Sequence, residues 1–407
     1  MKRRRYWIIL PLAVGVFFLS MTACSEKKTE ESTVEESEKR TEKGEKETTE
    51  AEAEGAEELD YENMTAEDLL KDLLDKTELS DENFVWLTST YRYVPITEEL
   101  QLEENITSEA FSLLREKEIR YTCSEDSMKQ LLASEYPQVR AEAYEWMESL
   151  LGLTDTNRAL AKEAIGTEKD PYVLRAMIRT LGNEGSDPEI GPFLISMSKH
   201  THPRVREQAA VWIGSSWNKE MEGAVEAEIA LIQDEDQEVA KAACRNCGGL
   251  EDDRVVAPLA EILNDETKYE LHGAAVDGLT DMWLDFPFHE ATSEAAYKAC
   301  MDYYKKTPRS ENVPFWTTVG EADMISESSF PEWKEKASYY KPEELIAVMK
   351  EIALDPNADW LGRTAAFDVI KTHGGREALE AIKPEVDALT DKDASLVQDS
   401  LEDELKD

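Results

Sequence analysis

The sequence predicts an all-α fold, a solenoid of stacked helix pairs that follows an apolar N-terminal segment and an acidic linker. The first observation is a repeat, because a branched apolar anchor residue returns every 32 or 34 positions. The anchors are Val139, Val173, Val205, Val239 and Leu271. The second observation is a stripe of small or apolar residues four and eight positions after each anchor. Since offsets 0, 4 and 8 lie on one face of a helix, each anchor is expected to be the first residue of a buried helix face.

Residues 1–23 have the composition of a targeting segment. The basic residues Lys2–Arg5 precede an almost wholly apolar run from Trp7 to Leu19, and Met21-Thr22-Ala23-Cys24 follows. This order resembles a bacterial lipoprotein signal peptide, which implies that Cys24 is lipidated and becomes the first mature residue. The alternative is an uncleaved membrane anchor, for which the apolar run is barely long enough. Either reading places the bulk of the chain outside the cytoplasm, on the extracytoplasmic face of a cell membrane.

Residues 24–62 are predicted to be the lipidated cysteine and a disordered linker. From residue 25 to residue 62 there are 16 acidic and 6 basic residues, and almost no large apolar side chain precedes Leu59. Such a segment cannot bury enough surface to offset the entropy of its chain. We therefore expect a self-repelling tether and assign no site to it.

Residues 63–135 are predicted to form a helical N-terminal region. Thr65 and Asp68 have the spacing of a capping box ahead of a leucine-rich amphipathic helix. Around Phe84–Ile96 the aromatic and β-branched residues favour a short strand or a loop.

Residues 136–301 contain the regular repeats. Each repeat is expected to have a first helix, which contains the anchor, and a second helix after it. Gly182, Gly214 and Gly248 lie where three of the first helices are expected to end, and glycine is common just past the end of a helix. Second helices are expected from Asp187-Pro188 and over 222–232 and 253–263. The Pro-x-Val-Arg starts, the alanine column and the Leu-Gly endings resemble HEAT repeats, in particular the short bacterial kind associated with phycobilisome lyases. That resemblance implies a stacked α-solenoid and implies little about activity.

The register is lost over residues 302–342, an aromatic and proline-rich insertion. It contains Phe315, Trp316, Trp333 and Tyr339, which we select as candidate partner-binding residues. Long irregular insertions in a regular array are usually functional or disordered, and this one is too aromatic for plain disorder. Two interpretations stay open: a loop that binds peptide or sugar, or aromatic side chains that fill the end of the solenoid core.

Residues 343–407 are predicted to hold two degenerate repeats and a polar cap. Asp359 and Asp393 are 34 residues apart, and each precedes a helical pattern. The last helix ends in acidic residues, as a terminal repeat with a polar outer face should.

No sequence pattern compels an enzyme, a metal site or a cofactor. Cys244 and Cys247 have thiol-oxidoreductase spacing, but the register places them at the end of a helix, with Cys247 in the core column. His200 and His202 have no further ligands nearby, so His202 is interpreted as a turn residue at a helix entry. With 88 acidic residues against 45 basic ones, the chain lacks the basic footprint that nucleic-acid binding needs.

The function expected from these features is a membrane-anchored scaffold of HEAT-like repeats outside the cytoplasm. Its partner would be a protein or a cell-wall component of cationic character, because the net charge is −43. Glu222 and Glu226, on one predicted second helix together with Glu228, are the candidate contacts on the acidic face of the solenoid. The alternative is an accessory or catalytic subunit of an envelope enzyme complex.

Overall fold

The computed structural model describes residues 59–406 apart from 62, 98–104, 148, 150–153, 285–288, 290–291, 307–318, 324 and 326–328. Residues 59–407 form one compact unit. Its described part is helical, with no strand and a single isolated bridge between Glu78 and Arg120. The predicted all-α class is therefore confirmed. Within the described residues, no helix combines the length and the apolar character needed to cross a bilayer.

The N-terminal region is a group of short helices. They are α1 (Ala66–Leu69), α2 (Asp81–Ser89), η1 (Thr90–Tyr93), α3 (Ile106–Glu116) and α4 (Glu125–Leu132). The Thr65 capping box is present, since the Thr65 hydroxyl accepts the Asp68 N–H while the Asp68 carboxylate accepts the Thr65 N–H. The capping box is confirmed, but the leucine-rich helix expected after it is wrong in length, because α1 ends at Leu69 and turns follow.

The strand or loop expected around Phe84–Ile96 is wrong, because most of that segment is helical. Ser80 caps α2 by accepting the Asn83 N–H, and two acidic residues occupy the first turn. Phe84, Val85, Leu87 and Thr88 are buried, which is the pattern of one helix face. The capping and the burial outweigh the weak strand preference of aromatic and β-branched residues.

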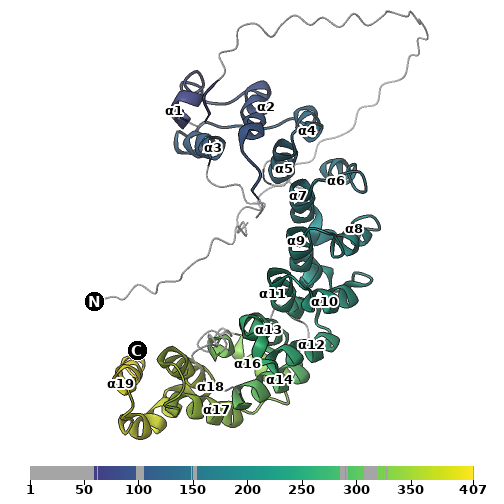
Figure 1. Ribbon diagram of the computed structural model, residues 1–407. Helices are drawn as coiled ribbons and strands as arrows, with labels where there is room; N and C mark the ends of the chain where they lie inside the picture. The colour runs from purple at the N-terminus through teal and green to yellow at the C-terminus, as the bar shows by residue number, and fades with distance from the viewer. Residues whose placement is uncertain are drawn as a thin grey trace, which may run out of the picture. The chain divides into compact units, whose positions relative to one another are not determined.

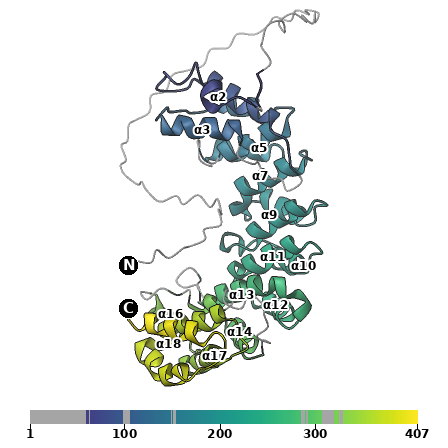
Figure 2. The ribbon, with the colours of Figure 1, turned by 60° about the vertical axis from the view of Figure 1, so that its left-hand side comes forward.

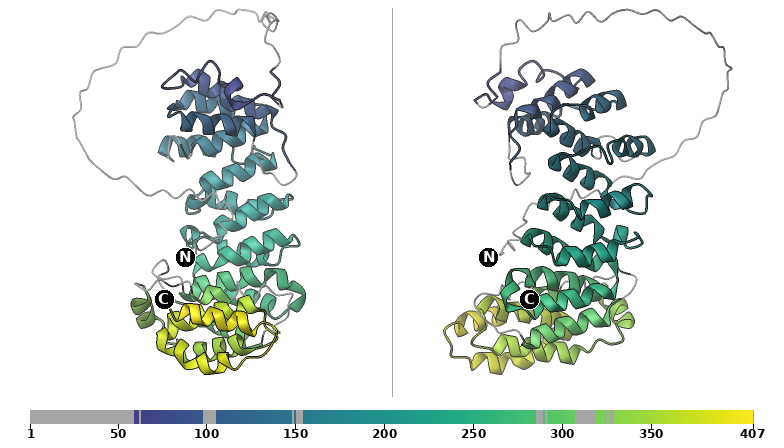
Figure 3. Two further views of the ribbon diagram at one scale, coloured as in Figure 1. Left: turned by 90° about the vertical axis from the view of Figure 1, so that its left-hand side faces the viewer. Right: turned by 45° about the vertical axis from the view of Figure 1, so that its right-hand side comes forward.

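The repeats form two layers of helices (Figure 1). The first helices are α5 (Pro137–Trp146), α7 (Pro171–Leu181), α9 (Pro203–Ile213), α11 (Gln237–Asn246) and α13 (Tyr269–Leu284). The second helices are α6 (Asp155–Lys162), α8 (Ile190–Met197), α10 (Ala224–Ile232) and α12 (Val256–Leu263). First helices pack on one another in chain order, as Figures 2 and 3 show from other sides. Every anchor and every residue four or eight positions later is buried, so the predicted stripe is the core.

The glycines that follow the first helices have a different role from the one expected. Gly182 and Gly214 have φ values of −63° and −74°, so neither needs the left-handed conformation of a helix-terminating glycine. A Cβ on Gly182 would lie 2.2 Å from Trp212 Cγ, and one on Gly214 would lie 2.8 Å from the Asn246 carbonyl carbon. These positions hold glycine because the next repeat packs directly against the backbone there.

An arginine four positions after the N-cap residue of a helix links some repeats to the next. It pairs with a carboxylate 28 residues later, just before the next first helix, and that carboxylate also accepts a backbone N–H two residues on. The pairs are Arg140 with Glu168, Arg206 with Asp234 and Arg363 with Asp391, at 2.9, 2.7 and 2.8 Å. We call this arrangement the arginine clamp. Such charge-assisted, two-pronged bonds fix the register between neighbouring repeats.

The C-terminal part continues the helical stack. Its elements are α14 (Glu294–Lys306), η8 (Glu321–Asp323), α16 (Phe330–Lys336), α17 (Pro342–Leu354), α18 (Trp360–Asp387) and α19 (Ala394–Glu404). Asp359 caps α18 by accepting the Gly362 N–H, in agreement with the prediction that a helix follows Asp359. Gly375, with φ of +72°, divides α18 into two helices, so α17, α18 and α19 supply the two further units.

Candidate functional site

The aromatic residues of the insertion that the structure describes are packed in the core. Trp333 is fully buried, and its indole N–H donates to the Trp283 carbonyl at 2.6 Å. The ring of Tyr340 meets the Trp333 ring edge-on at 4.7 Å between centroids, and Tyr339 is half-buried. For Trp333 the structure therefore favours the core-filling interpretation. Phe315 and Trp316 lie outside the described residues, and so does Cys24.

His373 completes this aromatic core and has no free nitrogen. Its Nε2–H donates to the Ala322 carbonyl at 2.7 Å, and its Nδ1 accepts from the Tyr340 hydroxyl at 2.6 Å. Burial lowers the pKa of His373 to about 4, which keeps the imidazole neutral. The histidine is satisfied on both sides, so its role here is to join α18 to η8 and to the segment before α17.

The second helices present a mixed surface where the sequence predicts an acidic one. Glu222 is exposed just before α10, while Glu226 is paired with Arg254 at 2.6 Å. A backbone hydrogen bond and the Arg254 guanidinium lower the pKa of Glu226. The Asp253 carboxylate accepts the Ser293 hydroxyl at 2.5 Å. Whether Glu222 and Glu226 contact a partner stays a prediction.

Glu228 does not belong to this surface, because its side chain is fully buried between α9, α10 and α11. Its Oε1 lies beside the Gly214 backbone, and neither oxygen has a well-formed hydrogen bond among the described residues. Burial raises the pKa of Glu228 well above its usual value, and the Gly214 backbone opposes this only in part. The carboxyl is therefore held as the neutral acid.

The cysteine and histidine pairs are structural, as the sequence predicts. Cys244 and Cys247 are both buried, and burial raises the thiol pKa of Cys244 to about 12. A nucleophilic cysteine needs the opposite shift. His202 caps α9 by accepting the Arg204 N–H through Nδ1, and His200 accepts the His202 N–H in the same way. The described residues contain no group of three or more His, Cys, Asp or Glu side chains placed to hold a metal ion.

An exposed tryptophan in the turn between α9 and α10 was not selected from the sequence. Trp217 lies in η4 (Ser216–Asn218) with 73% of its surface exposed, the largest exposure among the big apolar side chains of the described residues. Directly after it, Asn218 is buried, and its amide donates to the carbonyls of Gly182 and Trp212 while accepting the Gly185 N–H. The Asn218 hydrogen bonds thus fix the backbone of the turn against the preceding repeat, while the Trp217 indole faces solvent. A tryptophan flanked by Ser215, Ser216 and Asn218 in a predicted turn could have revealed this site.

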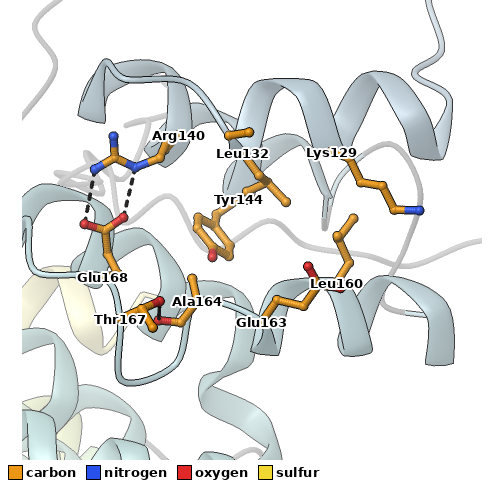
Figure 4. Close-up of a pocket in the computed structure, with 10 residues that line it drawn as sticks. Lys129, Leu132, Arg140, Tyr144, Leu160, Glu163, Ala164, Thr167 and Glu168 are labelled. Carbon is orange, nitrogen blue, oxygen red and sulfur yellow. Dashed lines mark hydrogen bonds and ion pairs between the residues drawn. The ribbon is translucent and has the colours of Figure 1, made fainter. Parts of the chain in front are cut away.

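A pocket between α4, α5 and α6 is the candidate cavity shown in Figure 4. It has a volume of about 230 Å³, and Tyr144, Leu132 and Leu160 form its apolar part. Both cations on its rim are already paired, Arg140 with Glu168 at 2.9 Å and Lys129 with Glu125 at 2.7 Å. This pocket is best described as a gap between neighbouring repeats whose charges are satisfied by the protein.

Comparison with known proteins gives a match to one family. Residues 125–212 and 191–280 match the model of HEAT repeats. No curated protein matches the chain. Two crystal structures of engineered proteins are similar to it. One is 16% identical, covers 83% of this chain and 87% of its own, and has a TM-score of 0.39. The other is 18% identical, covers 69% of this chain and 96% of its own, and has a TM-score of 0.24.

The matched residues coincide with the regular part of the fold. They begin at α4 and end within α13, the stretch that contains the anchors, the close-approach glycines and two of the three arginine clamps. The residues that match the model of HEAT repeats, 125–280, thus stack as an α-solenoid.

Proposed function

We propose that this chain is a lipid-anchored scaffold on the outer face of a bacterial cell membrane and that its HEAT-like repeats hold a protein partner. Repeat stacks of this type offer extended surfaces for binding. The lipoprotein-like segment that ends at Cys24 supports the location, and the acidic linker would hold the folded part away from the lipid.

The observation that carries the binding role is the exposed Trp217 on its fixed turn. The Asn218 hydrogen bonds hold the backbone that carries Trp217, so the backbone loses little entropy on binding. Tryptophan is also enriched among the residues that dominate interface energies. Two exposed acids, Glu220 and Glu222, follow in the same turn. A partner that has an apolar pocket bordered by basic residues fits this surface. The basic character of such a partner also suits the net charge of −43 of this chain.

A photo-crosslinking side chain at position 220 tests this role in cells that carry the full chain. We expect one discrete adduct that falls about tenfold in a Trp217→Ala background, as the loss of an interface anchor predicts. The matched control is Trp360→Ala, which removes an exposed tryptophan from the start of α18 and should leave the adduct unchanged. Equal adduct yields in the Trp217→Ala and unmodified backgrounds would show that the turn is not the contact.

The membrane anchor is tested separately with a Cys24→Ala variant. We expect the unmodified chain to incorporate labelled palmitate and to be processed ahead of Cys24, and the variant to do neither. Unchanged labelling and intact mass in the variant would contradict lipidation while leaving the binding role of Trp217 open.

A further inference from the structure

A second cavity lies at the start of the repeats and is built differently from the one between α4, α5 and α6. It has a volume of about 260 Å³ and lies between the end of α2, η1, the end of α4 and the start of α5. Its floor is formed by the buried side chains of Leu131 and Val139. Its walls and rim are polar or aromatic, formed by Ser89, Arg92, Gln130, Ser134, Glu135 and Tyr136.

Tyr136 occupies a position where the other repeats place a capping side chain. Asp170, His202 and Asp236 each accept a backbone N–H at the start of their first helix. Tyr136 makes no such bond, and 40% of its surface is exposed beside the cavity. Giving up a helix cap costs about 1 kcal/mol. Such departures from a local rule are expected at functional or strained sites.

Arg92 is held in place by the aromatic residues around it. Its Nη2 donates to the Tyr93 hydroxyl at 2.6 Å, and its guanidinium carbon lies 4.6 Å from the Tyr93 ring centroid. Tyr93 in turn stacks on Tyr61, with ring centroids 4.1 Å apart. Next to the cavity, the start of α5 is joined to the residue after η1, because the Gln138 amide donates to the Val94 carbonyl at 2.8 Å. Arg92 is therefore positioned before a ligand binds, while Gln130 and Glu135 are exposed on the rim.

The charges of the rim exclude strongly ionic ligands. Arg92 disfavours a cation in the cavity, and Glu135 disfavours an anion. A neutral molecule with several hydroxyl groups suits both, since the guanidinium donates hydrogen bonds and the carboxylate accepts them. Gln130 and the two serine hydroxyls can do either. The volume is below the usual range for drug-sized ligands, so it admits about one six-membered ring.

We propose that this cavity binds one pyranose ring of a neutral glycan, with the sugar's apolar face on the Tyr136 ring and its hydroxyls on Arg92, Gln130 and Glu135. Trp86, 39% exposed, lies one helical turn before Ser89 on α2 and offers a surface for the next sugar of the chain. This site is independent of the Trp217 turn, so the two can fail separately. It would add a carbohydrate of the envelope to the partners of the scaffold.

Isothermal titration of the full chain with neutral β-linked tetrasaccharides of glucose and of N-acetylglucosamine tests the proposal. We expect saturable binding that weakens about tenfold in Tyr136→Ala, the factor that corresponds to about 1.4 kcal/mol of lost stacking and burial. Tyr136→Phe keeps the ring and should retain binding within about twofold. Gln130→Ala, at an exposed position, should weaken binding without altering the melting temperature.

The matched control is Trp360→Ala, because Trp360 has the same 40% exposure as Tyr136 but lies at the start of α18. Its affinity for the tetrasaccharides should equal that of the unmodified chain. The proposal is overturned if neither tetrasaccharide binds the unmodified chain, or if Tyr136→Ala and Trp360→Ala lose affinity equally. It is also overturned if a tetralysine or tetraaspartate peptide displaces the sugar at lower concentration than a second glycan does.

Discussion

Replacing the buried acid Glu228 by glutamine should change how the stability of the repeat stack depends on pH. In the folded chain the Glu228 carboxyl is fully buried and stays protonated, because burial raises its pKa well above the usual value. In the unfolded chain its pKa returns to about 4.5. Above that pH, unfolding releases a proton, so the folded state loses stability as the pH rises towards the raised pKa. Glutamine has the shape of the neutral acid and does not titrate.

The size of the effect follows from the linkage relation. Wherever the unfolded carboxyl is ionised and the folded one is still protonated, the free energy of unfolding falls by about 1.4 kcal/mol for each unit of pH. Glu228→Gln should therefore become more stable relative to the unmodified chain by that amount for each unit of pH over this range. Leu194 and Leu259 occupy the corresponding places in α8 and α12, so Glu228→Leu should stabilise the stack at pH 7 by about 1–3 kcal/mol.

Amide hydrogen exchange of α9, α10 and α11 is the suitable assay, because it reports local opening and does not require all-or-none unfolding of a repeat array. The protection of these helices is compared at pH 5 and pH 7, after correction for the intrinsic exchange rate. Glu222→Gln is the control, since it removes an exposed acid next to the same helix. A difference between Glu228→Gln and the unmodified chain that is the same at both pH values would refute the reasoning.

Three further predictions concern packing and titration. Gly278→Ala should destabilise the chain by about 1–3 kcal/mol in chemical denaturation, because its Cβ would lie 2.0 Å from the Cys244 carbonyl oxygen. That clash outweighs the gain of about 1 kcal/mol in helix propensity, whereas Gly320→Ala, with open space around it, should be nearly neutral. Trp333→Ala should cost about 3–5 kcal/mol, measured in the same way, because it empties a fully buried site. Between pH 6.5 and pH 4 the chain should lose about 3 kcal/mol through His373, whose neutral form the fold requires, and a His373→Gln variant should lose correspondingly less.

The repeat register and the core could be read from the sequence because both depend on local periodicity. Val205 and its partners at offsets 4 and 8 form one helix face whatever the neighbouring repeats do, and all of them are buried. The segment around Phe84 was predicted from its residue types and not from its periodicity. Its residue types favour a strand, yet the Ser80 cap and the spacing of its apolar residues are those of a helix. The capping pattern was the better guide.

The features that escaped prediction depend on contacts between distant parts of the chain. Gly182 has an ordinary helical φ, and only the approach of Trp212 from the next repeat explains why no larger residue fits. The local sequence does not distinguish Glu228 from an exposed glutamate. Its burial follows from the packing of α10 between α9 and α11. Trp217 has no periodic signature at all, because its exposure is set by the hydrogen bonds of the neighbouring Asn218.

The uneven placement of the arginine clamp divides the stack into mechanically distinct segments. The clamp joins α5 to α7 and α9 to α11, but the corresponding position is Leu174 between α7 and α9, and Ala240 between α11 and α13. In an array whose stability is a sum of nearest-neighbour terms, junctions with and without this two-pronged pair then alternate, and the α11–α13 junction has instead the single exposed pair of Arg245 and Asp277. Under a pulling force applied between the two ends of the folded part, the chain should extend in blocks of two repeats, with rupture starting at the junctions that lack the arginine clamp. A repeat stack of this kind can give way in steps while each pair of repeats keeps its own surface intact.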